Sequence, residues 1–598
     1  MDDQNKNLIL ATVLSGIVIL VWFVLFPPEE VATVEPATDI IEQVVPDGAV
    51  LPTVETTNGT PATAEVEDAP EAPRLTVETP SLTGTISLQG GRIDDLSLVN
   101  YRETLDEDSD LVRMLSPLSA DAPYYALFGW APGAGVAPDA VPGPNTIWNV
   151  EAGETLTPET PVTLVWDNGA GLTFRRAISV DENFMFSIEQ SIENASGAAV
   201  TMAPYGIIAR HGDPDGVGFF IQHEGVVRMA DGVREEIKYD DMQDLDADPR
   251  GQGVSEIVEV TENGWIGFTD QYWMTALLPS PGTAFRSAAR YTEATAIYQT
   301  ETIYPTRTIE PGATSSAESN VFAGAQKWET IREYQNKNGF ERFLDAIDWG
   351  WFFFLTKPIF ALLHFIDGLI GNMGWSIILL TLIIKAVLLP LAYKSYVSMA
   401  KMKELQPEME ALKAEAGDNR EKMQKGMMEL YKKNKVNPAS GCLPILLQIP
   451  IFFSLYKVIF VTIELRHAEW IGWIHDLSAP DPSSILNLFG LLAFTPPEPG
   501  TMLAYISLGI LPILLGISMF LQQKLNPAPT DPTQKMIFAW MPWVFMFMLG
   551  NFASGLVLYW IANNTITFIQ QYLIMRSQGY RPDLIGNILG NRSEAEKK

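Results

Sequence analysis

The stretch GWSIILLTLIIKAVLLPLAY, residues 374–393, decides how the rest of the chain is interpreted. It is long enough to cross a bilayer as a helix, and it contains a single charge, Lys385. A cation near the centre of a spanning helix costs about 2.5–3.5 kcal/mol to insert, so it normally faces a protein interior or a wet cavity. The next charge, Lys394, lies about 13 Å further along a helix axis, and a lysine stem covers only part of that distance. We therefore expect a functional site at Lys385, with snorkelling or a structural ion pair as the alternative interpretations.

Composition divides the chain into a polar part and an apolar part. The 598 residues carry a net charge of −32, mainly from residues 27–340, whereas long apolar runs dominate residues 349–575. An acidic first part argues against nucleic acid as its partner. Cys442 is the one cysteine, so neither an intrachain disulfide nor a cysteine-based metal cluster can form.

The first 74 residues predict an anchor followed by a tether. Residues 8–26 are uncharged and span about 28 Å as a helix, and they end in bulky rather than small side chains. Residues 1–28 are therefore expected to be an N-terminal transmembrane anchor, with a cleaved signal peptide as the competing interpretation. Residues 29–74 are acidic and poor in aromatic residues, which predicts a disordered acidic linker.

Residues 75–340 contain short runs of alternating apolar and polar residues, separated by Gly, Pro, Asn and Asp. Period-two alternation between turn residues is typical of antiparallel sheet, so this region predicts one large β-sandwich. A short helical piece is expected near residues 326–338. Residues 341–372 include an apolar segment with Lys357, His364 and a proline, which favours an amphipathic helix lying in the membrane interface over a true span.

Five further apolar segments predict a membrane core over residues 373–575. They are residues 374–393, 442–465, 501–523, 536–550 and 554–574. Together with the N-terminal anchor they make six spans. Residues 394–435 carry ten basic residues and are expected in the cytoplasm, whereas residues 466–500 carry an acidic excess and are expected outside. Both chain ends, including the tail 576–598, are then cytoplasmic.

The basic connection, residues 394–436, has an internal apolar seam. Spacings of three and four residues predict two short helices that form an antiparallel hairpin, with Asp418 and Glu421 as a capping box for the second helix. Loops of two to eight residues suffice to join two spans, so a protruding hairpin indicates a docking or gating role; a simple connector is the alternative. The seam residues are Met402, Leu405, Met409, Leu412, Met423, Met427 and Leu430.

Polar side chains recur inside the apolar segments. Thr381 stands one helical turn before Lys385, and two further pairs one turn apart occur in the last segment. Such groups need protein or water partners at membrane depth, so converging faces would line a hydrated groove; interhelical hydrogen bonds are the other interpretation. No metal-ligand, phosphate-loop or nucleophile-elbow motif occurs. The remaining polar candidates are Gln448, Tyr559, Trp560, Asn563 and Asn564.

Three stretches resemble the YidC/Oxa/Alb family of membrane protein insertases, in its Gram-negative form with a large periplasmic domain. They are YKSYVSMAKMKELQPEMEALK (residues 393–413), NPASGCLPILLQIPIFFSLYKVI (437–459) and FASGLVLYWIANN (552–564). The resemblance implies a mixed fold: a periplasmic antiparallel β-supersandwich similar to sugar mutarotases, and a polytopic α-helical bundle with a five-helix core. The interfacial helix and the cytoplasmic hairpin belong to the same pattern.

The resemblance also implies a mechanism without catalysis. A cation at Lys385, where many members have arginine, draws polar tails of substrates into a hydrophilic groove. Thr381, Tyr559 and Trp560 lie where a nascent span passes, and Gln448 and Pro450 lie beside that path. Nascent membrane proteins, the Sec translocon, ribosome–nascent chain complexes and membrane lipids are the implied partners, and no cofactor or metal is implied. The inner membrane is the implied location.

Two rival functions remain at this stage. A membrane-tethered periplasmic carbohydrate-active enzyme would need paired carboxylates or His and Glu on a concave face of the sandwich. A small-solute transporter would show inverted repeats between its halves, and none is evident in the sequence.

Overall fold

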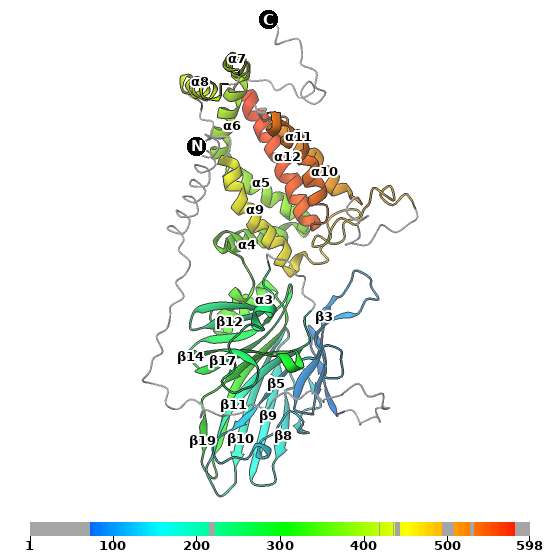
Figure 1. Cartoon of the computed structure of the whole chain (residues 1–598). Coiled ribbons are helices and arrows are strands. Elements are labelled where there is room, and N and C mark those ends of the chain that lie inside the picture. The colour runs from blue at the N-terminus through cyan, green and yellow to red at the C-terminus, as the bar shows by residue number, and fades with distance from the viewer. Residues whose placement is uncertain are drawn as a thin grey trace.

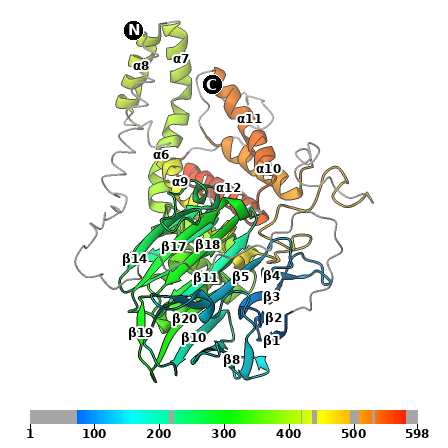
Figure 2. The ribbon, with the colours of Figure 1, turned by 60° about the horizontal axis from the view of Figure 1, so that its bottom comes forward.

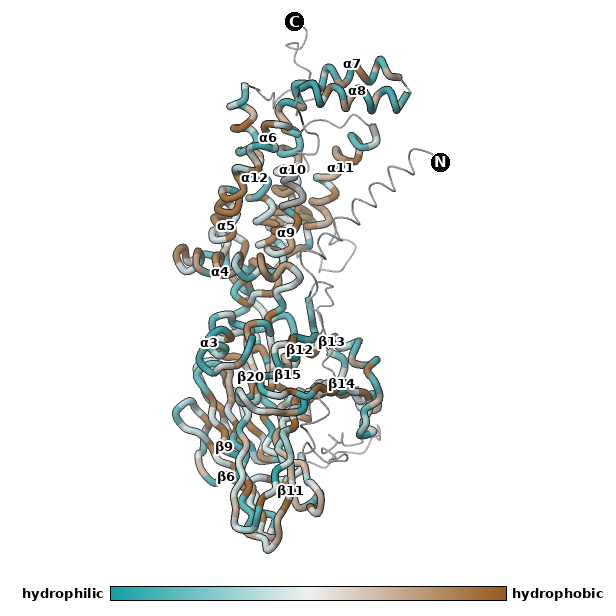
Figure 3. Tube along the Cα trace, turned by 90° about the vertical axis from the view of Figure 1, so that its left-hand side faces the viewer, coloured by the Kyte–Doolittle hydropathy of each residue, from teal (hydrophilic) through white to brown (hydrophobic). Residues whose placement is uncertain are grey.

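The computed structural model describes residues 72–214, 222–417, 419–434, 436, 443–492, 507–526 and 532–579. The anchor predicted at residues 1–28 and nearly all of the linker predicted at residues 29–74 lie outside these ranges, as does most of the tail. Figure 1 shows two stacked parts, a β domain and a helical bundle, and the hydropathy colouring of Figure 3 shows that apolar residues are frequent along the bundle helices.

The β domain consists of two large sheets packed face to face, which confirms the predicted sandwich. Among the described residues, all strand pairs are antiparallel except β1 with β7. In sheet order, the larger sheet holds β14 (Val254–Val260), β17 (Phe285–Thr292), β18 (Ile297–Ile303), β11 (Val200–His211), β5 (Tyr124–Pro132), β3 (Arg92–Arg102), β2 (Leu82–Ser87), β1 (Arg74–Glu78) and β7 (Thr155–Leu156), with β19 (Arg307–Ile309) on β11 and β4 (Leu111–Leu115) on β3. The smaller sheet holds β13 (Val233–Lys238), β12 (Gly225–Ala230), β15 (Gly264–Thr269), β16 (Trp273–Pro279), β20 (Thr314–Ala325), β10 (Met185–Asn194), β9 (Leu172–Val180), β8 (Val162–Asp167) and β6 (Asn149–Ala152).

Strand β9 shows why the sequence folds this way. Its residues alternate between buried and half-buried, and Phe174 and Ile178 point into the core between the sheets. Arg176 occupies a core position of the same strand. Its guanidinium donates to the carbonyls of Gly90 and Gly91 at 3.1 and 2.8 Å and lies over the ring of Trp148 at 4.7 Å. A buried cation is tolerated here because backbone oxygens replace its water.

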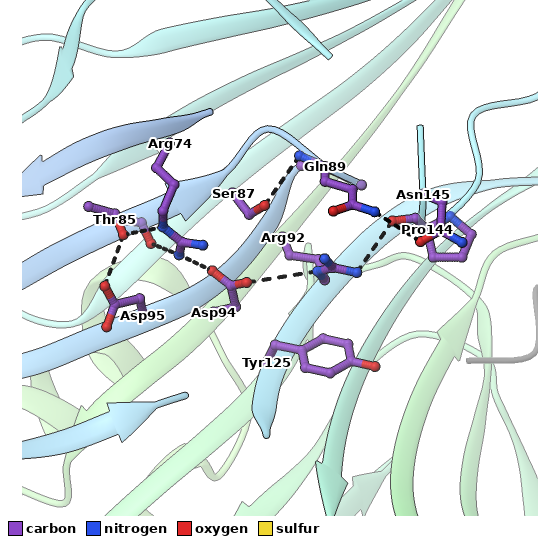
Figure 4. A network of polar contacts seen from close by, with 12 residues as sticks. Arg74, Thr85, Ser87, Gln89, Arg92, Asp94, Asp95, Tyr125, Pro144 and Asn145 are labelled. Carbon is purple, nitrogen blue, oxygen red and sulfur yellow. Dashed lines mark hydrogen bonds and ion pairs between the residues drawn. The ribbon is translucent and has the colours of Figure 1, made fainter. Parts of the chain in front are cut away.

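A polar network ties the first strands together at one end of the larger sheet (Figure 4). Asp94, 1% exposed, forms ion pairs with Arg74 and, at 3.8 Å, with Arg92. The Arg92 guanidinium also donates to the carbonyl of Pro144 at 3.3 Å and lies over the ring of Tyr125. Because the buried Asp94 is shared by Arg92 in the core and Arg74 at the surface, we assign the network to holding the edge of the sheet.

Outside the sheets, the regular elements in the described ranges are helices. The β domain contributes α2 (Tyr239–Met242) and α3 (Trp328–Asn338), the latter where a short helix was predicted. The bundle holds α4 (Phe353–Ile370), α5 (Met373–Val387), α6 (Leu389–Glu404), α7 (Gln406–Ala416), α8 (Arg420–Lys433), α9 (Leu443–Val461), α10 (Ile510–Gln523), α11 (Pro532–Met548) and α12 (Ser554–Ser577). The 3₁₀ turns are η1 (Pro138–Ala140), η2 (Glu293–Thr295), η3 (Phe343–Ala346) and η5 (Ile463–Leu465).

The segment at residues 374–393 is not the straight helix that its composition predicts. Helix α5 ends at Val387, and the chain continues as α6 at a bend of 69°. Pro390 lies in the first turn of α6, where its missing N–H is tolerated, whereas inside one long helix it would break the hydrogen-bond ladder. Pro407 has the same position in α7, so Met402 belongs to α6 and not to the first helix of the hairpin.

By length and composition, α4 could cross a membrane alone, and α5 with α6 could do so as a bent pair, among the described residues. Figures 1 and 3 show α4 lying across the bundle, between it and the β domain, and α4 packs against α5 and α9. Its Lys357 forms an ion pair with Asp345 and its His364 contacts Glu329 at 3.0 Å, so its polar side faces the β domain.

The β domain is fixed to the bundle through the last turns of α9. Lys457, 4% exposed, forms an ion pair with Asp348, and that carboxylate also accepts the backbone N–H of His223 at 3.0 Å. The amide of Gln271 donates to the carbonyl of Phe460 at 3.1 Å. A buried charge pair with additional hydrogen bonds defines one relative position of the two parts.

Removing the ammonium of Lys457 should weaken this junction strongly. In Lys457→Ala the Asp348 carboxylate stays buried without its cation, and such a loss costs about 3–5 kcal/mol. We expect a large fall in the unfolding temperature of the purified protein in detergent. Lys422→Ala is the matched control, because Lys422 pairs with Glu415 at 3.1 Å on the surface, where a pair contributes about 1 kcal/mol or less. Equal shifts for the two variants would contradict the assigned role.

The junction should also be sensitive to acid. Burial raises the pKa of Asp348, but the Lys457 ammonium and the hydrogen bonds outweigh burial and hold that pKa below its usual value. A carboxyl with a lowered pKa stabilises the folded state above its unfolded pKa of about 3.9, and this contribution is lost as the pH falls through the lowered value. We expect the unfolding temperature to decrease once the pH drops below about 4. The decrease should be smaller in the double mutant Asp348→Asn with Lys457→Met, in which the charged pair is replaced by neutral residues.

Candidate substrate groove

Lys385 takes part in a chain of polar contacts between three helices. Its ammonium, on α5, donates to the side-chain oxygen of Gln448 on α9 at 3.0 Å. The amide nitrogen of Gln448 donates in turn to the hydroxyl of Tyr559 on α12, which is 2% exposed. Gln448 can serve both partners because its amide has an acceptor at one atom and donors at the other. The structure thus brings together three residues that the sequence placed on separate segments.

A small cavity of about 30 Å³ adjoins Lys385. A space of this size can hold a water molecule or two, and several polar groups border it. None of its lining residues is acidic. They are Lys385, Leu388, Leu391, Ala392, Tyr396, Gln448 and Gln570.

Two of the predicted residues, Thr381 and Pro450, lie close to this chain of polar contacts but are not members of it. Thr381 is 1% exposed, and its hydroxyl donates to the carbonyl of Ile377 in its own helix at 2.7 Å. Pro450 lies inside α9, half a turn beyond Gln448, and is half-buried. A proline inside a helix removes one backbone hydrogen bond, so it marks a point where α9 can bend.

The remaining predicted residues, Trp560, Asn563 and Asn564, lie on α12 between Tyr559 and Gln570. The amide of Asn564 donates to the hydroxyl of Ser518 on α10 at 3.1 Å, so it joins two helices and does not face the cation. Trp560 packs against Phe452 of α9, with ring centroids 5.1 Å apart. In the described part of the chain, the indole N–H of Trp560 and the side-chain oxygen of Asn563 are buried and have no hydrogen-bond partner. Buried polar atoms without partners favour contact with water or substrate.

Sequence reasoning missed Gln570 and Tyr396. The amide of Gln570 donates to the backbone carbonyl of Lys385 at 3.4 Å, and Tyr396 lines the cavity from α6. The signal for Gln570 was present, because Tyr559, Asn563 and Thr567 follow one another at four-residue spacing on the same helix, and Gln570 continues that face. The bend after α5 brings Tyr396 back towards Lys385, and no spacing rule anticipates that bend.

The hairpin residues gather in a small apolar cluster. Leu405 and Met409 are buried in it together with Val436, and Met402, Met427 and Leu430 pack against them. Leu412 packs against Gly426, and any side chain at position 426 would collide with Leu412. Met423 is half-buried outside this cluster. The predicted capping residue Asp418 lies outside the described residues; Asn419 caps α8 instead, accepting the backbone N–H of Lys422 at 2.9 Å.

Replacing Gln448 by leucine should leave two polar groups without a partner. In Gln448→Leu the Lys385 ammonium and the Tyr559 hydroxyl each lose a hydrogen bond, at about 1–3 kcal/mol for a buried group. We expect a lower unfolding temperature than for the control Gln570→Leu, which removes only the longer contact with a backbone carbonyl. A double-mutant cycle of Gln448→Leu and Tyr559→Phe should show a coupling energy of about 0.5 kcal/mol or more, and strict additivity would mean that the contact contributes nothing.

The comparisons with known proteins cover nearly the whole chain. Residues 74–362 match the family model described as YidC periplasmic domain, and residues 365–580 match the model described as 60Kd inner membrane protein. "Membrane protein insertase YidC" of Roseobacter denitrificans is 63% identical over 100% of this chain and 99% of its own length. The protein of the same name from Dinoroseobacter shibae is also 63% identical, over 99% of this chain and 98% of its own length.

Solved structures are more distant. "Active YidC insertase crystal structure with the first transmembrane domain resolved" is 17% identical, with a TM-score of 0.34, over 83% of this chain and 92% of that one. A galactose mutarotase related enzyme from Lactobacillus acidophilus is 11% identical, with a TM-score of 0.30, over 42% of this chain and 97% of its own. Scores this low support no structural argument, so the assignment depends on the sequence relatives and the family models. The chain belongs to the YidC family of membrane protein insertases.

Proposed function

We propose that this protein inserts nascent membrane segments and short polar tails into the inner membrane, alone or with the Sec translocon, by drawing the polar part towards Lys385. The observation that carries this proposal is that no carboxylate among the described residues pairs with the ammonium of Lys385. Its partner Gln448 is neutral, and none of the residues lining the adjoining cavity is acidic. Lys457, one helix away, is instead neutralised by Asp348. Lys385 therefore keeps its attraction for an acidic tail.

The neighbouring surface suits the apolar part of a substrate. Leu382 and Val387 flank Lys385 on α5 and are 49% and 74% exposed. A substrate helix that leaves the cation can slide onto such side chains and then into lipid. Burial of apolar surface contributes about 25 cal/mol per Å², so release of an apolar segment from water is downhill without a chemical step. In this proposal the protein binds and releases its substrate, and burial of the substrate's apolar segment in lipid is the driving force.

The proposed topology follows the charges of the connections. The hairpin of α7 and α8, the N-terminus that precedes the membrane-spanning part of the anchor, and the tail at residues 576–598 lie in the cytoplasm, and the β domain lies in the periplasm. The six-span arrangement and the domain limits given above are part of the proposal. Ribosome-bound nascent chains and the Sec translocon are the proposed partners, with the basic hairpin as their contact surface and membrane lipids around the core.

The proposal is tested by reconstituted insertion of a client with a short acidic tail. A hydrogen-bonded charge contributes about 1.5–3 kcal/mol, so Lys385→Ala should slow insertion about tenfold or more, whereas Lys385→Arg should keep most of the rate. The measurement is protease protection of the client in proteoliposomes that contain this protein without Sec.

Two controls make the result specific. A client whose tail acids are replaced by Asn and Gln should lose little of its rate in Lys385→Ala, because no charge is then attracted. Lys422→Ala removes an exposed cation of the hairpin and should leave both clients unaffected unless a ribosome is present. Normal insertion of the acidic client by Lys385→Ala would refute the electrostatic role.

A further inference from the structure

The connection between α9 and α10 contains an apolar turn, residues 485–492, that neither the family assignment nor the groove explains. Residues 482–497 carry no charge. Five large apolar side chains of the turn are exposed, and Leu491 reaches 84% exposure. The others are Ile485, Leu488, Phe489 and Leu492. A contiguous apolar surface of this kind marks a contact with lipid or protein.

The turn is attached to one end of the helical bundle. The backbone N–H of Ile485 donates to Leu508 at 2.8 Å, and that of Leu511 in α10 donates to the Asp481 carboxylate at 2.8 Å. The first turn of α12 is joined to the same connection, because Ser554 donates to the carbonyl of Ala479 at 2.7 Å. Figure 1 shows this gold connection beside the ends of α10 and α12.

The lengths of two helices place that end inside the bilayer. Helix α10 has 14 residues, about 21 Å, and ends at Gln523, with Lys524 as the C-cap residue. Helix α11 covers a similar length from Lys535 to its last residue, Met548. Lysines at helix ends lie at the edge of the hydrocarbon core, which is about 30 Å thick. The opposite tips of α10 and α11 therefore fall about 9 Å short of the far edge, and the turn lies at these tips.

The backbone of the turn is suited to such a place. Irregular backbone is excluded from lipid unless its polar groups are satisfied internally. Seven of the eight residues of the turn donate their N–H within the protein: Ile485, Leu486, Leu488, Phe489, Gly490, Leu491 and Leu492. Leu488 and Phe489 adopt left-handed backbone, with φ of 51° and 59°, which bulky side chains rarely do. The hydrogen bonds within the turn hold Leu488 and Phe489 in this left-handed conformation.

We propose that the turn 485–492 is seated in the acyl region of the leaflet at this end of the bundle, where it fills the depth that α10 and α11 leave open. Lipid acyl chains are the occupant, because the bundle tip is short, the run is uncharged and seven of the eight N–H groups of the turn are bonded within the protein. This surface is distinct from the groove at Lys385, and the inference does not depend on which side of the membrane that end faces.

Site-directed fluorescence tests the placement. In a Cys442→Ala background, Leu491→Cys carries an environment-sensitive nitrobenzoxadiazole label, and the full-length protein is reconstituted in vesicles of phosphatidylethanolamine and phosphatidylglycerol. Trp540→Cys on α11, 65% exposed, serves as the lipid reference, and Val150→Cys on the β domain, 41% exposed, as the aqueous reference. Quenching is measured with doxyl-labelled lipids and with iodide.

Label at position 491 should behave like label at position 540. We expect doxyl lipids to quench it several-fold more than label at position 150, and iodide to quench it several-fold less. Iodide quenching equal to that at position 150 would overturn the proposal, since the turn would then lie in water. Protection from both quenchers would also overturn it, because a second copy or another protein would then cover the turn.

Discussion

The central constraint in this molecule is the free-energy cost of keeping an ammonium group away from bulk water without neutralising its charge. Lys385 meets that constraint with a neutral partner, the Gln448 side chain, and a cavity that admits water. A carboxylate partner would lower the cost further, but it would cancel the charge that a substrate is proposed to feel. Helices α5, α9 and α12 meet at this point, and each contributes one member of the polar chain.

The fold was largely predictable from patterns of hydrophobicity. The alternation in strands such as β9 gave the sandwich, and the apolar segments correspond to α5, α9, α10, α11 and α12. Local chemistry set the limits of prediction. Composition could not show that Pro390 would end one helix and start another at a bend of 69°, because a proline inside an apolar run is compatible with a kink or a break. Nor could alternation show that Arg176 is a core residue, because its partners are backbone carbonyls from another part of the chain.

Prediction of the site was less complete for the same reason. Lys385 stood out because one charge in an apolar segment is costly wherever it lies. Its pairing with Gln448 and Tyr559 depends on how three helices are rotated, which spacing within each helix does not determine. Asn564 shows the converse: its polarity suggested the groove, yet its amide binds Ser518 and holds α10 to α12. A polar residue in a membrane segment predicts that it has a polar partner, but it does not predict which residue that partner is.

Helix α9 carries both Gln448 and Lys457, nine residues or about 13 Å apart, with Pro450 between them. One end of this helix is bonded to the β domain and the other to the ammonium of Lys385. Because Pro450 removes one backbone hydrogen bond from α9, the helix can bend between these two contacts, and movement at one end would change the tilt at the other. A displacement of the β domain would therefore reach the contact between Gln448 and the ammonium that we propose attracts the substrate.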